Sequence, residues 1–189
     1  MSPLKTSAVV IIAGSVVFLI AAFSPISRVF GLPSPDARLQ LINSSLRAWS
    51  VSQVLFSVGA VVTAFGGILA ASALRTRPGS PLLYVAGALL LVGSAAWSWS
   101  VYLRAINPGA FIHGTLPGWH FVVYTLLTMA SFVLIGAALL RMGFPAWAGW
   151  LLVAASLLFF ILYLIFKDMP PFVYYLLGAV LGVVLFRAG

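Results

Sequence analysis

The chain has 189 residues, of which 63% are hydrophobic and 6% charged, and this balance excludes a water-soluble domain, where about a quarter of residues are charged. Ten basic residues against two acids give a net charge of +8, but they lie singly at the ends of apolar runs. That placement suits anionic lipid headgroups and excludes nucleic acid as the expected partner. The absence of cysteine excludes disulfides, thiolate metal sites and thiol catalysis.

Six apolar segments are predicted to cross a membrane as helices. A span needs about 20 apolar residues, because the hydrocarbon core is about 30 Å thick. The predicted spans are residues 7–30, 47–74, 81–104, 119–140, 146–166 and 171–187, of which the last is short. We therefore expect an all-α, polytopic transmembrane helix bundle that forms a single integral membrane domain over residues 1–189. In size and layout alone, the chain resembles small bacterial membrane proteins such as the substrate-binding subunits of some vitamin importers.

The first span raises the question of a signal peptide. Its apolar stretch is long for a signal core, and no clean cleavage site between small residues follows it. We expect a helix that is retained in the protein.

The connection between the first two spans predicts a short amphipathic helix on the membrane surface. Ser34, Pro35 and Asp36 suit the N-cap, the first helical position and the first turn. Leu39 and Ile42 then recur at helical spacing and form an apolar face. This helix is expected either to extend the second span or to act as a lid.

An internal pattern predicts three helical hairpins. Residues 70–75, 136–141 and 182–187 each comprise a small residue, three more residues, a large apolar residue and arginine. Either duplication or recurring solutions to membrane packing accounts for the pattern.

The same pattern predicts the orientation. One face receives Lys5, Arg75, Arg77, Arg141 and Arg187, and the other receives Arg28, Arg38, Arg47, Arg104 and Lys167 together with both acids, Asp36 and Asp168. The first set is concentrated in very short loops, where positive charge most strongly favours the cytoplasmic side. We expect a bacterial or archaeal plasma membrane with both termini in the cytoplasm.

Small residues line one face of the second span and recur in the sixth. Such faces let helix backbones approach closely in lipid. The residues assigned to helix packing are Gly59, Thr63, Gly66, Ala70, Gly178 and Gly182. They are expected to pack within the bundle, or alternatively to form an interface with a second copy or another membrane protein.

Polar residues form stripes at helical spacing on the second, third and fourth spans. Unpaired polar groups are costly in hydrocarbon, so the stripes must face each other or water. One interpretation is an outward-opening, aromatic-lined cavity, and the other is an interfacial aromatic belt with hydroxyls that bond between helices. The candidate ligand-binding residues are Gln53, Ser57, Trp97, Ser98, Tyr102, Arg104, His120, Tyr124 and Thr128.

No catalytic residue, metal site or cofactor is expected. His113 and His120 are seven residues apart and lack the spacing of a helical metal pair. No paired carboxylates are present for acid–base catalysis, and a dyad of Ser94 or Ser98 with His120 lacks an orienting acid and an oxyanion-hole signature.

The leading functional hypothesis is non-enzymatic binding or passage of a small neutral molecule, an anion or a lipid through an outward-facing cavity. One alternative is an accessory or assembly subunit of a larger membrane complex, and another is an intramembrane enzyme. The expected partners are membrane lipids, a small-molecule ligand, and a membrane protein or second copy. A cavity predicts that the stripe on the fourth span borders open, wet volume, whereas an accessory subunit predicts that the stripe is buried against other helices.

Overall fold

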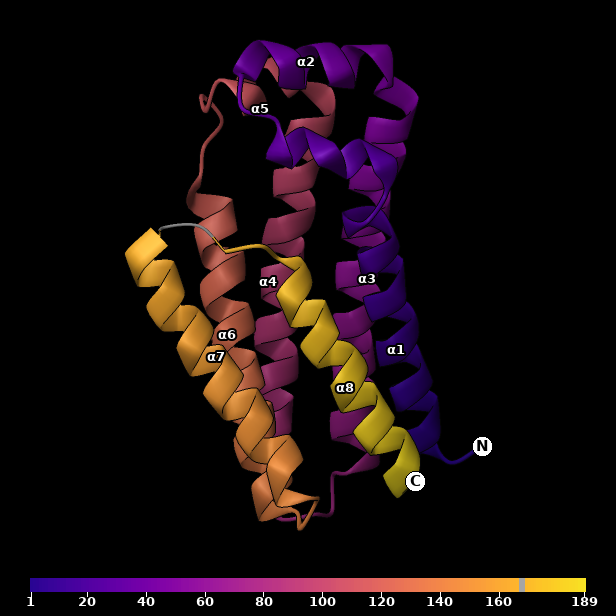
Figure 1. Ribbon diagram of the computed structural model, residues 1–189. Helices are drawn as coiled ribbons and strands as arrows, with labels where there is room; N and C mark the ends of the chain where they lie inside the picture. The colour runs from indigo at the N-terminus through magenta and orange to yellow at the C-terminus, as the bar shows by residue number, and fades with distance from the viewer. Residues whose placement is uncertain (167–168) are drawn as a thin grey trace.

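The computed structural model describes residues 1–166 and 169–189, and throughout these residues the regular structure is helical. The long helices are α1 (Pro3–Ala22), α3 (Leu46–Ala73), α4 (Ser80–Ile106), α6 (Trp119–Arg141), α7 (Ala146–Phe166) and α8 (Phe172–Ala188). The short ones are the 3-10 helix η1 (Pro25–Gly31), α2 (Pro35–Ser44) and α5 (Pro108–Ile112). Both chain termini lie at one end of the bundle, the terminal end, and α2 and α5 lie at the opposite, distal end (Figure 1).

The expected transmembrane bundle is confirmed. Among the described residues, five long helices are long and apolar enough to cross a membrane, and α8 is a shorter apolar helix of 17 residues. Five of the six predicted segments agree with the observed helices to within two residues at each end. At about 1.5 Å per residue, α8 is about 25 Å long and therefore needs local thinning of the bilayer or snorkelling of flanking side chains to cross it.

The first segment differs from the predicted continuous span of residues 7–30. Helix α1 ends at Ala22 and is followed by η1. The residue before a proline disfavours helical geometry, so Pro25 excludes Ser24 from an uninterrupted helix. The hydroxyls of Ser24 and Ser27 each donate a hydrogen bond to the Ala21 carbonyl over 2.7 Å, and these bonds satisfy a carbonyl at the helix end.

Helix α2 begins as its sequence predicts. The Ser34 hydroxyl accepts a hydrogen bond from the Ala37 amide over 3.2 Å, with Pro35 in the first turn. The chain turns at Ser45, so α2 is not an extension of α3; it crosses the distal end of the bundle (Figure 1). Its apolar face buries Ile42 in a small cluster with Ile26, Val29 and Trp49.

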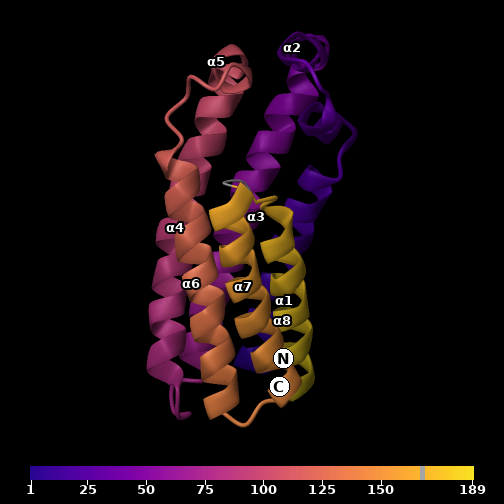
Figure 2. The ribbon, with the colours of Figure 1, turned by 60° about the vertical axis from the view of Figure 1, so that its left-hand side comes forward.

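The long helices pack in the spatial order α8, α1, α3, α4, α6, α7, and α7 and α8 contact each other at few positions. The first two predicted hairpins therefore have packed partners. The two helices of the third instead pack on different neighbours, α7 on α6 and α8 on α1, as Figures 1 and 2 show. Lys167 and Asp168, assigned to the distal face from the sequence, lie outside the described residues.

The small residues of α3 and α8 lie against α1. A Cβ atom at Gly59 would lie 2.6 Å from the Phe18 backbone nitrogen, and one at Gly66 would lie 2.6 Å from Cγ1 of Ile11. On the other side of α1, a Cβ at Gly178 or Gly182 would lie 2.7 Å from the Ser15 hydroxyl or 2.5 Å from Cγ1 of Ile12, respectively. Thr63 and Ala70 are also buried. Helix α1 is thus enclosed by α3 and α8 at distances that only glycine permits.

Candidate functional site

The distal half of the bundle contains a cavity of about 900 Å³. Residues of α1, η1, α3, α4, α5, α6, α7 and α8 line it, together with the α5–α6 and α7–α8 connections. Helices α3 and α4 have 28 and 27 residues, whereas α7 and α8 have 21 and 17. The longer pair extends past the α7–α8 connection (Figure 1), and Pro170 and Pro171 of that connection form part of the wall.

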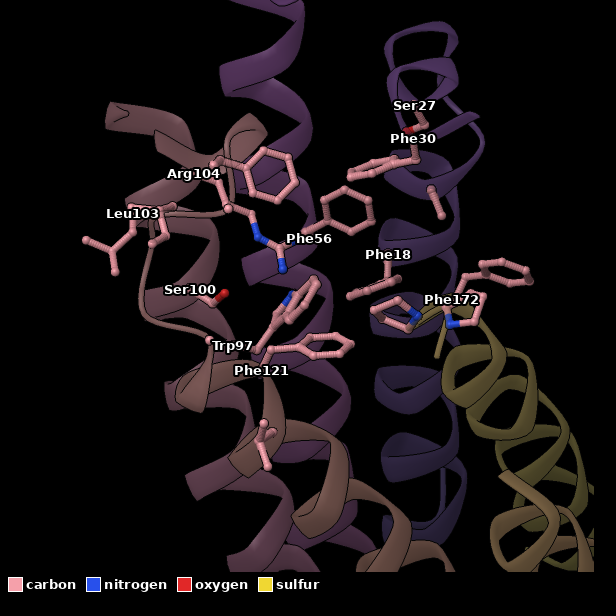
Figure 3. A pocket seen from close by; sticks show the side chains of 18 of the residues that line it. Phe18, Ser27, Phe30, Phe56, Trp97, Ser100, Leu103, Arg104, Phe121 and Phe172 are labelled. Atoms are coloured by element: carbon pink, nitrogen blue, oxygen red, sulfur yellow. The ribbon is translucent and has the colours of Figure 1, made fainter. Parts of the chain in front are cut away.

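Aromatic side chains dominate the wall. Figure 3 shows Phe121 and Phe172 on different sides of the pocket, and Phe18 lies against Trp97 with ring centres 5.8 Å apart. The aromatic lining comprises Phe18, Phe30, Phe56, Trp97, Phe111, Phe121, Tyr163 and Phe172. The lining therefore suits an apolar guest.

Arg104 brings a positive charge into this aromatic environment. Its guanidinium carbon lies 5.0 Å from the ring centre of Trp97 and 4.8 Å from that of Phe111. Cation–π attraction at these distances orients the side chain across the cavity wall (Figure 3). The Arg104 carbonyl accepts a hydrogen bond from the Trp49 indole over 3.2 Å, which fixes the end of α4 against α3.

A packed aromatic layer forms the floor. Phe18 stacks on Tyr175 with ring centres 3.5 Å apart, and Trp97 lies 4.7 Å from Tyr124. The Tyr124 hydroxyl donates a hydrogen bond to the Tyr175 hydroxyl over 3.2 Å, joining α6 to α8. On the terminal side of this layer lie two voids of about 10 Å³ each, roughly the space of one water molecule.

The structure brings two of the nine candidate ligand-binding residues, Trp97 and Arg104, to the cavity. Ser57 donates a hydrogen bond to Ser98 over 2.7 Å, and this bond links α3 to α4 instead of facing the cavity. Tyr102 is 51% exposed and packs against Trp99.

The remaining candidates are buried between helices. Gln53 is buried, and neither atom of its side-chain amide has a hydrogen-bond partner among the described residues. The His120 ring lies against Trp119 with ring centres 3.6 Å apart, and its Nδ1 lies 3.3 Å from the Pro117 carbonyl oxygen. Tyr124 belongs to the floor, and Thr128 borders one of the small voids. The stripe on the fourth span is therefore buried, as an accessory subunit predicts, and the cavity lies beside it with a different lining.

Six of the missed cavity residues are phenylalanines, which the sequence gives no reason to separate from lipid-facing or core positions. A signal was present on α4, where Trp97, Ser100 and Arg104 fall at i, i+3 and i+7 on one helical face. The polar stripes predicted a site on the third and fourth spans, but they did not identify the face of α4 that lines the cavity.

The serines considered for a dyad have other hydrogen-bond partners in the structure. Among residues 1–166 and 169–189, no three metal-ligating side chains gather. The Ser94 hydroxyl donates to the Ala60 carbonyl over 3.1 Å, and Ser98 bonds to Ser57, so neither serine uses His120 as its hydrogen-bond partner.

The fold and cavity define a class: a polytopic helical membrane protein with an aromatic cavity at the end opposite its termini. No family model, curated protein or solved structure matches the chain.

Proposed function

We propose that this protein binds an amphiphilic or largely apolar small molecule in its distal cavity. The observation that carries the proposal is a cavity of about 900 Å³ walled by aromatic rings. Ligand pockets in proteins occupy about 300–1,000 Å³ and combine apolar walls with a few polar groups. Arg104 and Ser100 are such groups here.

Binding fits the cavity floor better than passage does. A through-path would have to cross the contacts of Phe18 with Tyr175 and of Trp97 with Tyr124. Beyond them lie two voids of about 10 Å³ each in the described part of the chain. A solute that enters from the distal end therefore stops at the aromatic layer.

The position of the cavity favours a guest drawn from the membrane. With the termini in the cytoplasm, the distal end faces outward, and the short α7 and α8 end below the tops of α3 and α4 (Figure 1). The α7–α8 connection borders the cavity at this step. An acyl chain from the outer leaflet is a guest that suits this aromatic lining.

The experiment places a larger side chain on α1 so that it occupies part of the cavity. Ala22 lines it, whereas Ala13 lies on the exposed face of the same helix. Purified Ala22→Phe should bind a fluorescent acyl-chain probe at least severalfold more weakly than the unmodified protein and carry less copurifying lipid by mass spectrometry. Ala13→Phe, the matched control, should match the unmodified protein in both assays. Equal binding by all three proteins would remove the proposal.

The accessory-subunit alternative has one observation in its favour, the burial of the stripe on the fourth span. His120, Tyr124 and Thr128 are all less than 5% exposed. The test is crosslinking in intact cells followed by purification in mild detergent. Recovery of a stoichiometric membrane-protein partner, together with an empty cavity, would favour this alternative.

A further inference from the structure

The tryptophans and tyrosines of this chain are either well exposed or buried. Six of them are at least 42% exposed, whereas the other six are at most 9% exposed. The exposed ones are Tyr84, Trp99, Tyr102, Trp119, Trp147 and Trp150. Exposed tryptophans and tyrosines of membrane proteins concentrate at the two levels where hydrocarbon meets the lipid headgroups. Their positions on the helices therefore indicate where the bilayer begins and ends.

Three of the exposed rings, those of Trp99, Tyr102 and Trp119, form a distal belt. The ring centres of Trp99 and Tyr102 lie 5.5 Å apart on α4. The Trp99 ring lies 6.4 Å from that of His120, which lies against Trp119. The last turns of α4 and the first turn of α6 therefore present these rings at one level of the bundle.

The other three, Tyr84, Trp147 and Trp150, form a terminal belt. Gly149 lies between the two tryptophans, and a Cβ atom there would lie 2.6 Å from Cγ of Leu140 on α6. Gly79, next to the start of α4, lies against the same part of α6, since a Cβ there would lie 3.2 Å from Cβ of Arg141. The first turns of α4 and α7 and the last turns of α6 thus lie side by side.

The two belts are separated by less than the thickness of a typical bilayer core. Along α4, Tyr84 lies about 22 Å from Trp99 and about 27 Å from Tyr102. Helix α8, with 17 residues, is about 25 Å long. A typical hydrocarbon core is about 30 Å thick. The spacing of the belts and the length of α8 are two separate measures of the apolar layer, and both give about 25 Å.

Charged residues lie outside the belts on α4 and its neighbours. The run from Pro78 to Leu103 contains no charged residue, and its exposed side chains between the belts are apolar. Next to the terminal belt, Arg75, Arg77 and Arg141 are exposed in the short connections, where their guanidinium groups reach the headgroups. The charges therefore mark the same boundaries as the aromatic rings.

We infer that the lipid-facing surface of this protein fits a bilayer with a hydrocarbon layer about 25 Å thick, bounded by the two belts. Helices α2 and α5 and the distal ends of α3 and α4 then stand among the headgroups and in water (Figure 1). This inference goes beyond the proposed function, because it holds whether or not the cavity binds a ligand.

The first experiment measures which lipids the exposed surface prefers. The purified protein is reconstituted in vesicles that contain a brominated phosphatidylcholine, which quenches exposed tryptophans, and unbrominated phosphatidylcholines of increasing chain length compete with it. A lipid whose hydrocarbon layer is about 25 Å thick should compete at least about twofold better than one whose layer exceeds about 32 Å, because hydrophobic mismatch is unfavourable. Equal competition by all chain lengths would overturn the inference.

A matched pair of variants tests the distal belt. The double variant Trp99→Leu, Trp119→Leu removes rings that are 52% and 60% exposed, and it should lose about half of the preference for the thinner lipid. The control Phe65→Leu removes an exposed ring of α3 midway between the belts, where a Cβ at Gly67 would lie 3.4 Å from Cδ1 of Leu90. It should retain the full preference. An unchanged preference in the double variant would contradict the distal belt as a boundary.

Spin labels test both boundaries without altering the belts, and the absence of native cysteine permits single labels. Ala88 and Ala95 are exposed on α4, about one turn inside Tyr84 and Trp99, respectively. Labelled Ala88→Cys and Ala95→Cys should be shielded equally from a water-soluble nickel chelate. Strong exposure of either label to the chelate would overturn the inference.

A third label tests the water side of the distal belt. Ser57 bonds to Ser98, the neighbour of Trp99, so α3 reaches the level of the distal belt there. Ala48 is exposed about 13 Å farther along α3, and labelled Ala48→Cys should be accessible to the chelate. Shielding of this label equal to that of Ala95→Cys would place the distal end in hydrocarbon and overturn the inference.

Discussion

The helices pack closely in the terminal half of this bundle and surround a cavity in the distal half. In the terminal half, Gly66 and Gly182 bring backbones so close to α1 that an added Cβ would lie 2.6 Å from Ile11 or 2.5 Å from Ile12. In the distal half, Phe56, Phe121 and other side chains line a cavity of about 900 Å³. Small residues let the helix backbones of a membrane bundle approach closely.

Differences in helix length also distinguish the distal half from the terminal half. Helices α3 and α4 continue past the ends of α7 and α8, so the distal half has fewer helices around it (Figure 2). The short elements η1, α2 and α5 and the α5–α6 connection lie there instead. A region walled by short elements opens more readily than one enclosed by six helices.

The largest expected effect concerns which half faces outward. Thr76 is exposed in the short connection at the terminal end, and His113 is exposed at the distal end. With no native cysteine, single Thr76→Cys and His113→Cys variants give a clean readout in intact cells. An impermeant thiol reagent should label His113→Cys and leave Thr76→Cys unlabelled until the membrane is permeabilised. The reverse pattern would invert the orientation and turn the cavity toward the cytoplasm.

A smaller effect is expected from a substitution in the closely packed terminal half. Gly66→Leu forces a side chain against the backbone of Ile11 and should reduce stability by about 1–3 kcal/mol, as overpacking does in other cores. Val61→Leu, at a position that is 43% exposed on the same helix, should be nearly silent. Thermal unfolding in detergent followed by size-exclusion chromatography measures both. If the two variants melt together, the glycine face does not hold α1.

The smallest effect tests the floor between the halves. Tyr175→Phe removes the 3.2 Å hydrogen bond from Tyr124 and should cost about 0.6 kcal/mol, the average for such bonds between membrane helices. Tyr174→Phe removes a buried hydroxyl that has no hydrogen-bond partner in the described part of the chain, so it should leave stability unchanged or raise it. Chemical denaturation in mixed micelles resolves this difference. A larger loss for Tyr174→Phe than for Tyr175→Phe would contradict the assigned floor.

Local sequence signals predicted the helices well. The span of residues 146–166 matches α7 at both ends, and the Ser34–Pro35–Asp36 start of α2 is found as expected. The predicted continuation of the first span to residue 30 was wrong, although Ser24–Pro25 carried the signal for an interruption. Apolar length outweighed that local signal in the prediction.

The candidate site was predicted less completely. Trp97 and Arg104 lie in the cavity, but polar spacing also selected Gln53, His120 and Tyr124, which are buried between helices. Periodicity shows that residues share a face of one helix. It does not show whether that face meets another helix or an open space, because this depends on how far apart the neighbouring helices lie.

The sequence by itself determined that this chain forms apolar helices and where most of them begin and end, because hydrophobic length and capping act locally. Only the tertiary structure decided that α7 and α8 pack on different partners and that phenylalanines from several helices line one cavity. Every long helix is apolar around most of its surface, so hydropathy does not distinguish lipid from neighbour. That choice depends on the fit of side-chain volumes across all the helices together.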